Sequence, residues 1–337
     1  MIELIRKAQP QFKANLHAHS NLSDGALTPE EMKKVYKEKG YSILALTDHN
    51  YPLPHNDMTE ADFLMLTGYE ANIKNADATR YTPEVHLCLY ARDPENRTYI
   101  GYDSQAPRYV RFIKDPENVR FIPTKSPRVY TSEYINEFIE SAKEHGYIVA
   151  HNHYAWSLES EAQVLEYKGL FSMEICNGGC WLVGNLEYNA ALYDKMLRRG
   201  MRIFCHGTDD NHNVYQEGPE CDSFVAYTYV LADELTYDSV FSALEKGDFY
   251  ASRGPQIHSL TMDGRHARIE CSNAKVIYAY FGGKDALFRY APKGESLTVA
   301  EFDIREDAPY VRFSVFDEYG NSADTRGYFA DELGWNQ

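Results

Sequence analysis

The stretch Tyr41-Ser42-Ile43-Leu44-Ala45-Leu46-Thr47-Asp48-His49-Asn50 decides the fold class of this 337-residue chain. Its apolar first half predicts a buried strand, and the polar residues Asp48 and His49 follow directly at the carboxyl end of that strand. Polar side chains at the carboxyl end of a buried strand are typical of parallel α/β proteins, in which these ends form the functional rim.

The residues before this strand predict a helix. Thr28 is suited to the N-cap, Pro29 to the first turn, and Glu31 to closing a capping box with Thr28, while Gly40 ends the helix. The same alternation of short apolar runs and helical patterns extends from residue 12 to about 250. It predicts parallel βα units.

The remaining elements follow from the same patterns. We expect strands over 63–66, 84–90, 147–150, 172–176 and 201–205, and helices over 132–145, 187–199 and 236–246. Residues 91–130 break the rhythm with many Pro, Arg and Tyr residues, which predicts an insertion over the mouth of a barrel. Short alternating runs separated by turn signals then predict a small antiparallel β-sandwich over 256–337, after a larger domain over 1–255.

The composition excludes several classes of protein. The net charge of −16 is spread along the chain, which argues against a surface that grips long nucleic acid, although a small phosphorylated substrate remains compatible with it. The six cysteines include no CxxC pair, and several lie in apolar runs, so we expect reduced, buried thiols and a cytoplasmic location. No signal peptide or membrane-spanning stretch is recognisable.

Histidines and acids recur at or just beyond the ends of the predicted strands. One HxH or one Asp-His pair is weak evidence, because surface histidines or a hydrogen-bonded histidine explain it as well. Repetition at nearly every strand end changes the balance, because imidazoles and carboxylates gathered at one rim suit zinc, manganese or iron. The candidate metal ligands are His17, His19, Asp24, His49, Glu70, His86, His153, Asp210 and His212.

The order of these motifs resembles the PHP (polymerase and histidinol phosphatase) superfamily. The resemblance covers residues 12 to about 255, and the stretch Gly247–Pro255 is similar to members with a C-terminal β-rich appendage. It implies a distorted seven-stranded βα barrel with a trinuclear metal centre, in a family whose known members are mostly phosphoesterases. It also implies three sets of ligands: His17, His19, Glu70 and Asp210; Glu70, His86 and a later histidine; and Asp24, His49 and His212.

Two of these assignments stay open at the level of sequence. The later histidine is His153 or His151, with His153 preferred because His153-Tyr-Ala-Trp156-Ser157 resembles the His-Pro-x-Trp-Ser form of some members. The DxH spacing selects Asp210 over Asp209. Asp209 and Asp48 are then candidates for orienting imidazoles from outside the ligand set.

Further residues attract weaker predictions. Arg253 is a candidate for binding the substrate phosphate, with a salt bridge between domains as the plainer alternative. The same applies to three basic residues of the insertion, for which a solvated surface position is the alternative: Arg108, Lys125 and Arg128. Glu174 and Asn177 fit either a polar network or a substrate contact. We expect Cys176 and Cys180 to lie in the core.

The sequence therefore predicts a phosphoesterase that uses metal-activated hydroxide on a small phosphorylated substrate, with His49, His212 and Asp210 as catalytic candidates. Three divalent ions of manganese, iron or zinc are the expected cofactors. An amidohydrolase-type barrel acting on amides or esters is the first alternative. A non-catalytic binding module on a relic barrel is the second. The C-terminal domain is expected to complete the pocket or an oligomer interface.

Overall fold

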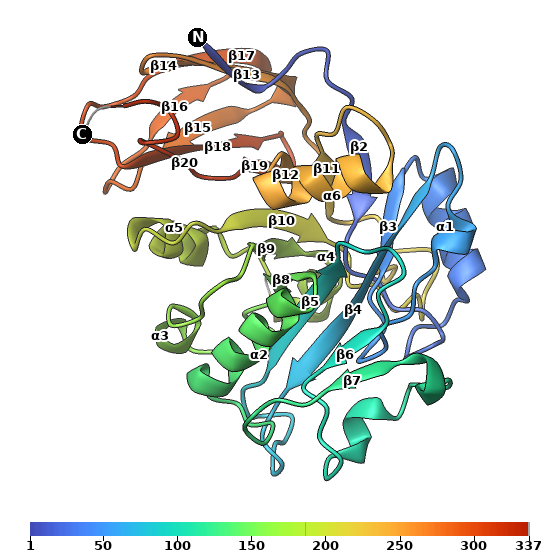
Figure 1. The fold of residues 1–337 in the computed structure, drawn as a ribbon. Coiled ribbons are helices and arrows are strands. Elements are labelled where there is room, and N and C mark those ends of the chain that lie inside the picture. Colours follow the sequence, from blue (N-terminus) through green and yellow to red (C-terminus); the bar gives the residue numbers. More distant parts are fainter. Residues whose placement is uncertain (186, 336–337) are drawn as a thin grey trace.

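The computed structural model describes residues 1–185 and 187–335 and shows a mixed α/β fold built around one 14-stranded sheet (Figure 1). Half of that sheet surrounds the candidate site. These strands, in their order along the sheet, are β10 (Phe204–Thr208), β9 (Ser172–Asn177), β8 (Tyr147–His151), β5 (Val85–Ala91), β4 (Leu64–Ile73), β3 (Ile43–Leu46) and β2 (Phe12–Asn15).

The sequence pattern predicted that all strands of this half run parallel, and this prediction is wrong for one strand. β2, β3 and β4 are parallel to one another, as are β8, β9 and β10, but β5 is antiparallel to both β4 and β8. The amino end of β5 therefore lies at the same edge as the carboxyl ends of its neighbours. This reversal places His86, the second residue of β5, at the functional rim.

The predicted closed barrel is not found in the described residues. A closed barrel would need β10 to pair with the strand at the other end of the half-sheet. β11 (Tyr227–Val230) instead pairs with β2 along one of its edges and with β12 (Phe249–Ser252) along the other, so β11 has no free edge for β10. Two isolated links span the gap instead. A bridge joins Ala18 to Asn211, and the Thr228 hydroxyl bonds both the backbone N–H and the carbonyl oxygen of Gly207. The strands thus curve into an incomplete barrel, and the sheet continues through β12.

The helices follow the predicted caps closely. α1 (Pro29–Glu38) has the Thr28–Glu31 capping box, and Gly40 just beyond it takes a left-handed φ of +76°. Figure 1 shows α1 beside β3 and α2 (Ser132–Glu144) beside β8. The other helices are α3 (Glu161–Val164), α4 (Gly178–Cys180), α5 (Ala190–Arg198) and α6 (Tyr237–Lys246). None of the helices in the described part of the chain has the length and hydropathy to cross a membrane.

The strand predicted over 63–66 is longer than expected, because β4 runs on to Ile73 and contains Glu70. Two further predicted boundaries are wrong for identifiable reasons. α5 begins at Ala190 rather than at Glu187, because the Glu187 carboxylate accepts hydrogen bonds from the backbone N–H groups of Ala155 and Trp156. That carboxylate therefore holds a neighbouring loop instead of starting the helix. β10 begins at Phe204 rather than at 201, because Gly200 and the residues after it form the turn that leaves α5.

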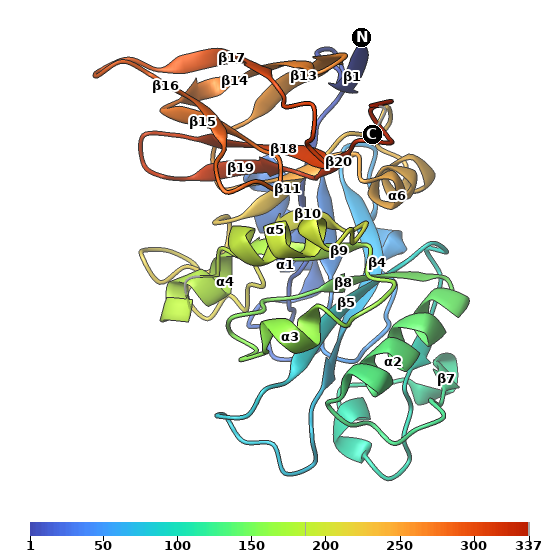
Figure 2. The same ribbon diagram turned by 90° about the vertical axis from the view of Figure 1, so that its left-hand side faces the viewer.

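The C-terminal strands form two antiparallel layers over a common core, as a β-sandwich does (Figure 2). One layer is a separate sheet of β1 (Ile2–Ile5), β13 (Ile257–Asp263), β14 (His266–Ala274) and β17 (Leu297–Asp303). The other continues the large sheet through β19 (Ser322–Thr325), β18 (Tyr310–Phe316), β15 (Val276–Tyr280) and β16 (Leu287–Tyr290), with β20 (Tyr328–Phe329) on β18. The N-terminal strand β1 thus belongs to the C-terminal layer, while the predicted domain boundary after residue 255 stays a prediction.

The insertion over 91–130 has a small structure of its own. It contains the short parallel pair β6 (Thr98–Ile100) and β7 (Arg120–Ile122) and two single turns of 3₁₀ helix, Pro107–Val110 and Pro116–Asn118.

All six cysteines are free, and five of them are buried.

Candidate metal centre

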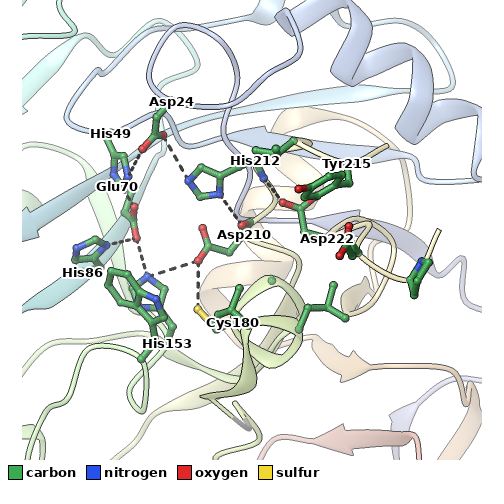
Figure 3. Close-up of a pocket in the computed structure, with 17 residues that line it drawn as sticks. Asp24, His49, Glu70, His86, His153, Cys180, Asp210, His212, Tyr215 and Asp222 are labelled. Carbon is green, nitrogen blue, oxygen red and sulfur yellow. Dashed lines mark hydrogen bonds and ion pairs between the residues drawn. The ribbon is translucent and has the colours of Figure 1, made fainter. Parts of the chain in front are cut away.

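All nine predicted ligand side chains converge at the rim of the incomplete barrel. Figure 3 labels those that line the cavity, among them His49, Glu70 and Asp210. The nine side chains come from segments far apart in sequence, which follow or lie on six strands of the same curved sheet: β2, β3, β4, β5, β8 and β10. Within each of four overlapping groups the candidate ligand atoms lie within 4.8 Å of one another. Seven of the nine side chains line a cavity of about 610 Å³: Asp24, His49, Glu70, His86, His153, Asp210 and His212. We call these nine residues the metal centre.

The first group lies at the buried floor of the metal centre. The Nε2 atoms of His17 and His19 are 3.2 Å apart, and each lies 3.1 Å from Oδ1 of Asp210. Glu70 closes the group, with Oε1 3.2 Å from His17 Nε2 and Oε2 3.5 Å from His19 Nε2. The alternation of side chains along the chain explains why both histidines of the HxH motif reach one point.

Glu70 is also the hub of the second group. Its Oε1 lies 3.0 Å from His86 Nδ1 and 3.1 Å from His153 Nε2, and its Oε2 lies 2.8 Å from His49 Nδ1. One carboxylate thus faces imidazoles from both sides. This is the arrangement required of an acid that bridges two cations.

Asp24 organises the third group, nearest to solvent. Its carboxylate oxygens lie 3.4 Å from His49 Nε2 and 3.5 Å from His212 Nε2. These two histidines are the most exposed imidazoles of the metal centre, with 17% and 33% of their side chains accessible. They therefore face whatever enters the cavity.

The donor set fits divalent cations. Glu70 Oε2 and His49 Nδ1 are both buried and have no partner with hydrogen-bond geometry, although they lie only 2.8 Å apart. Leaving such atoms unsatisfied is costly, and a cation between them would satisfy both. The set contains imidazole nitrogens and carboxylate oxygens without a thiolate, which suits manganese, iron or zinc.

The carboxylates of the metal centre raise the pKa values of neighbouring imidazoles. Burial acts to lower the pKa of His49, but the carboxylates of Glu70 and Asp24 raise it to about 10. Burial also acts to lower the pKa of His153, but Glu70 and Asp210 outweigh this effect and raise it to about 9. Both imidazoles are therefore protonated at neutral pH without a cation, and metal binding must release those protons.

Glu174 on β9 positions two of the ligands. Its Oε1 lies 2.7 Å from His17 Nδ1, and its Oε2 accepts a hydrogen bond of 2.7 Å from the backbone N–H of His153. Thr208 and Asn177 donate to the remaining lone pairs. Burial would raise the pKa of Glu174, but the His17 imidazole lowers it to about 2, so this carboxylate stays charged. Glu174 thus lies in a polar network behind the metal centre.

We expect Glu174→Gln to weaken metal binding by about 10- to 100-fold, the usual cost of losing the acid that orients a ligating histidine. The substitution keeps the shape of the side chain but removes the charge and one of the two acceptor oxygens, which position His17 and the backbone of His153. Titration of metal-free protein with Mn²⁺, followed by calorimetry, measures the change. A variant that melts at a lower temperature yet binds Mn²⁺ with unchanged affinity contradicts this role.

The two alternates of the ligand set lie outside it. His151 points into the core, where its Nε2 lies 2.6 Å from Glu159 Oε1, while His153 faces Glu70. Asp209 accepts hydrogen bonds from the Tyr36 hydroxyl and from the backbone N–H groups of residues 224–226. Asp210 adopts a left-handed φ of +52°, which turns its carboxylate into the metal centre while Asp209 faces the other way.

Removing His153 and His151 separately distinguishes a ligand from a core residue. We expect His153→Ala to lose bound metal and His151→Ala to keep it, because only His153 reaches the bridging acid Glu70. Elemental analysis of the two purified variants after equal Mn²⁺ loading gives the comparison. Equal metal content in both would contradict the assignment of His153.

The prediction that Asp48 and Asp209 orient imidazoles is wrong. Asp48 accepts hydrogen bonds from the backbone and hydroxyl groups of Ser20 and Ser23, and so fixes the loop that carries Asp24. Asp209 similarly fixes the backbone of 224–226. Both acids shape loops, because their oxygens are already taken by nearby N–H and O–H donors.

The basic residues predicted to bind phosphate lie in different environments in the structure. Arg253 does not line the cavity, and its guanidinium lies over the ring of Trp181, 4.2 Å from the centroid. Arg128 is buried against Tyr109 and cannot meet a ligand. Lys125 is exposed, whereas Arg108 lines a second, smaller cavity of about 210 Å³ beside the metal centre.

Sequence reasoning missed most of the apolar wall of the larger cavity. Beyond Trp156, which belongs to a quoted motif, the wall consists of Leu182, Val183, Val214, Tyr215 and Pro219. Cys180, expected in the core, is buried but also lines this cavity, with Sγ 3.8 Å from Asp210 Oδ2. No local pattern marks these loop residues, because only folding brings the 180–183 and 214–222 segments to the rim.

Comparison with known proteins finds a match over the segment that carries most of this site. A model of the PHP domain matches residues 15–156, the segment that holds seven of the nine residues of the metal centre. A stretch of 76 residues is 38% identical to the DNA polymerase/3'-5' exonuclease PolX of Bacillus subtilis (strain 168). That stretch is 23% of this chain and spans only 13% of the relative's length.

Two solved structures show a distant similarity to the chain. A two-domain protein from Bacteroides vulgatus, described as containing a predicted PHP-like metal-dependent phosphoesterase, is 15% identical, with 92% of this chain and 91% of that chain covered and a TM-score of 0.46. A candidate metal-dependent phosphoesterase from Bifidobacterium adolescentis is 19% identical, with 70% and 96% covered and a TM-score of 0.40. Both scores are too low to bear on function. The similarity to the PHP family rests on the domain match, in which residues 15–156 match the model of the PHP domain.

Proposed function

We propose that the protein hydrolyses a small phosphate ester at the metal centre. The observation that carries this proposal is the position of Glu70, whose two oxygens face His17, His86, His153 and His49 within 3.2 Å. A carboxylate shared in this way can hold two cations side by side, which is the arrangement that suits attack on phosphorus.

Three sets of residues would hold the cations. They are His17, His19, Glu70 and Asp210; Glu70, His86 and His153; and Asp24, His49 and His212. When bound, divalent manganese, iron or zinc supplies a water of lowered pKa and neutralises charge on the phosphoryl oxygens. The surrounding chain excludes bulk water from the floor of the site, because His17, His19 and Glu70 are fully buried.

His49 and His212 are the candidates for moving a proton to the leaving alkoxide. They are the two imidazoles most accessible from the cavity, and Asp24 lies between them. In the metal-free protein burial acts to lower the pKa of His212, but the Asp24 carboxylate raises it above its usual value. An imidazole can donate in this way only at a nitrogen that no cation occupies.

The residues of the larger cavity favour a phosphate ester over an amide. An amidohydrolase-type site would use a metal-bridging modified lysine, whereas the bridging position here is Glu70, and no lysine is among the described residues that line this cavity. A relic barrel would lack ligands, whereas all nine converge. The net charge of −16 supports a small substrate rather than long nucleic acid. Oligomer formation through the C-terminal strands is part of the same proposal.

The test is a phosphate-release screen over small phosphorylated metabolites with Mn²⁺-loaded protein. Parallel assays use p-nitrophenyl phosphate, a bis-phosphate diester and a panel of amides. Asp210→Asn should abolish turnover, and Asp209→Asn is the matched control, because that neighbouring buried acid faces away from the metal centre. Turnover of amides alone favours the amidohydrolase alternative. Phosphate release that persists in Asp210→Asn after chelation overturns the proposal.

A further inference from the structure

Two cavities meet at the metal centre. The larger, of about 610 Å³, and the smaller, of about 210 Å³, share four lining residues: Asp24, His49, His86 and Trp156. In Figure 3, Tyr215 lies across the larger cavity from His49 and His86. The larger cavity thus extends to one side of these histidines, while the smaller one is bounded by the insertion.

The larger cavity has an apolar outer wall. Leu182, Val183, Val214 and Tyr215 line it, and each is exposed, with Val183 70% and Val214 67% accessible. Exposed apolar side chains gathered around a polar site are typical of a surface that receives an organic group. This wall therefore fits the apolar part of a substrate.

The lining of the smaller cavity has three basic side chains against two acids, Asp24 and Glu84, in contrast to the acidic chain as a whole. The basic side chains are Lys74, Arg108 and Arg111. The Lys74 charge is balanced by Glu84, 3.1 Å away, whereas neither arginine forms an ion pair with any residue that the structure describes. Arg108 donates to the carbonyl oxygens of 75 and 76 at 3.4 Å and to a neighbouring hydroxyl, which leaves guanidinium N–H groups for a ligand.

The turn that carries the two arginines is anchored. Tyr109, between them, is buried, and its hydroxyl donates to the carbonyl oxygen of Lys74 at 3.1 Å. The buried Arg128 guanidinium lies over the Tyr109 ring, 4.1 Å from its centroid. The backbone that carries the arginines is thus held beside β4 before any ligand arrives, which reduces the entropic cost of binding.

A stack of side chains connects this turn to the metal centre. The Arg111 guanidinium lies over the ring of Phe112, 4.5 Å from its centroid, and Phe112 stacks on His49 at a centroid distance of 6.5 Å. One unpaired cation is therefore separated from a residue of the metal centre by a single aromatic ring.

We propose that the smaller cavity is an anion subsite, so that the substrate bears a second anionic group in addition to the ester at the metal centre. Arg108 and Arg111 hold that group, a carboxylate or phosphate, which guanidinium groups bind well. The apolar remainder of the substrate lies against the wall of the larger cavity. This inference rests on the proposed function and narrows its substrate class to apolar phosphate esters with a separate anion.

Binding of non-hydrolysable ligands tests the subsite without any turnover. We compare ω-phosphonoalkanoates of several chain lengths with their carboxamides on Mn²⁺-loaded protein by calorimetry. At one length or more, the carboxylate should bind at least about tenfold more tightly than the matched amide, because charged hydrogen bonds to arginine are of that magnitude. In the variant R108Q/R111Q the ratio of the two affinities should fall to nearly one.

The control variant is R120Q/K125Q, which removes the same charge from exposed positions of the same insertion outside both cavities. It should keep the preference for the carboxylate. A ratio near one at every chain length in the unmodified protein overturns the subsite, as does a preference that survives in R108Q/R111Q or is lost equally in R120Q/K125Q. A separate phosphate-release assay reports on the proposed function, so the two can fail independently.

Discussion

Glu70→Gln is expected to lower kcat/KM for phosphate ester hydrolysis by about 10³-fold or more, equivalent to roughly 4 kcal/mol of transition-state stabilisation. Glutamine has nearly the same shape, but its amide lacks the charge and one of the two acceptor oxygens that face four imidazoles. The variant should also hold fewer ions than the unmodified protein. Steady-state kinetics and elemental analysis on the same preparation measure both effects.

Glu159→Gln is the matched control for this change. Glu159 is also buried beside a histidine, with Oε1 2.6 Å from His151 Nε2 and with Tyr167 donating to Oε2, but it lies outside the metal centre. Its loss should cost about 1–3 kcal/mol of folding stability, because buried donors lose their acceptor, and leave metal content unchanged. If both glutamine variants retain full metal content and turnover, Glu70 is not the bridging acid.

Removal of divalent ions is expected to lower the melting temperature by several degrees. An ion that binds only the native state, at a concentration a thousandfold above its Kd, raises the free energy of unfolding by about 4 kcal/mol for each site. Chelation also leaves Glu70 Oε2 and His49 Nδ1 without partners, which adds to the loss. Calorimetric melts with chelator, and again after Mn²⁺ is restored, measure the change.

Asp210→Asn provides the comparison for this experiment, because it weakens the first group of ligands directly. The shift caused by chelator should be smaller in that variant than in the unmodified protein. Identical melting curves with chelator and with Mn²⁺ in the unmodified protein would show that no cation stabilises the native state.

Local signals in the sequence were sufficient for much of the secondary structure. The capping box of Thr28 and Glu31 predicts the start of α1, because cap and helix lie within four residues of each other. The direction of β5 could not be predicted, because a continuous apolar run reads the same in parallel and antiparallel sheets. Barrel closure depends on whether both edges of β11 are already paired, and that is decided by β2 and β12 from distant parts of the chain.

The sequence alone determined which kinds of side chain form the candidate site, because the pattern of histidines and acids at strand ends is written locally in the chain. Motif spacing already favoured His153 over His151 and Asp210 over Asp209. The tertiary structure supplied the physical reason, because these neighbours differ in the direction they face and in the partners they find. It also brought Glu174, the apolar wall and the arginines of the insertion to one rim. Such long-range convergence depends on how the strands curve and pair, and no short segment encodes it.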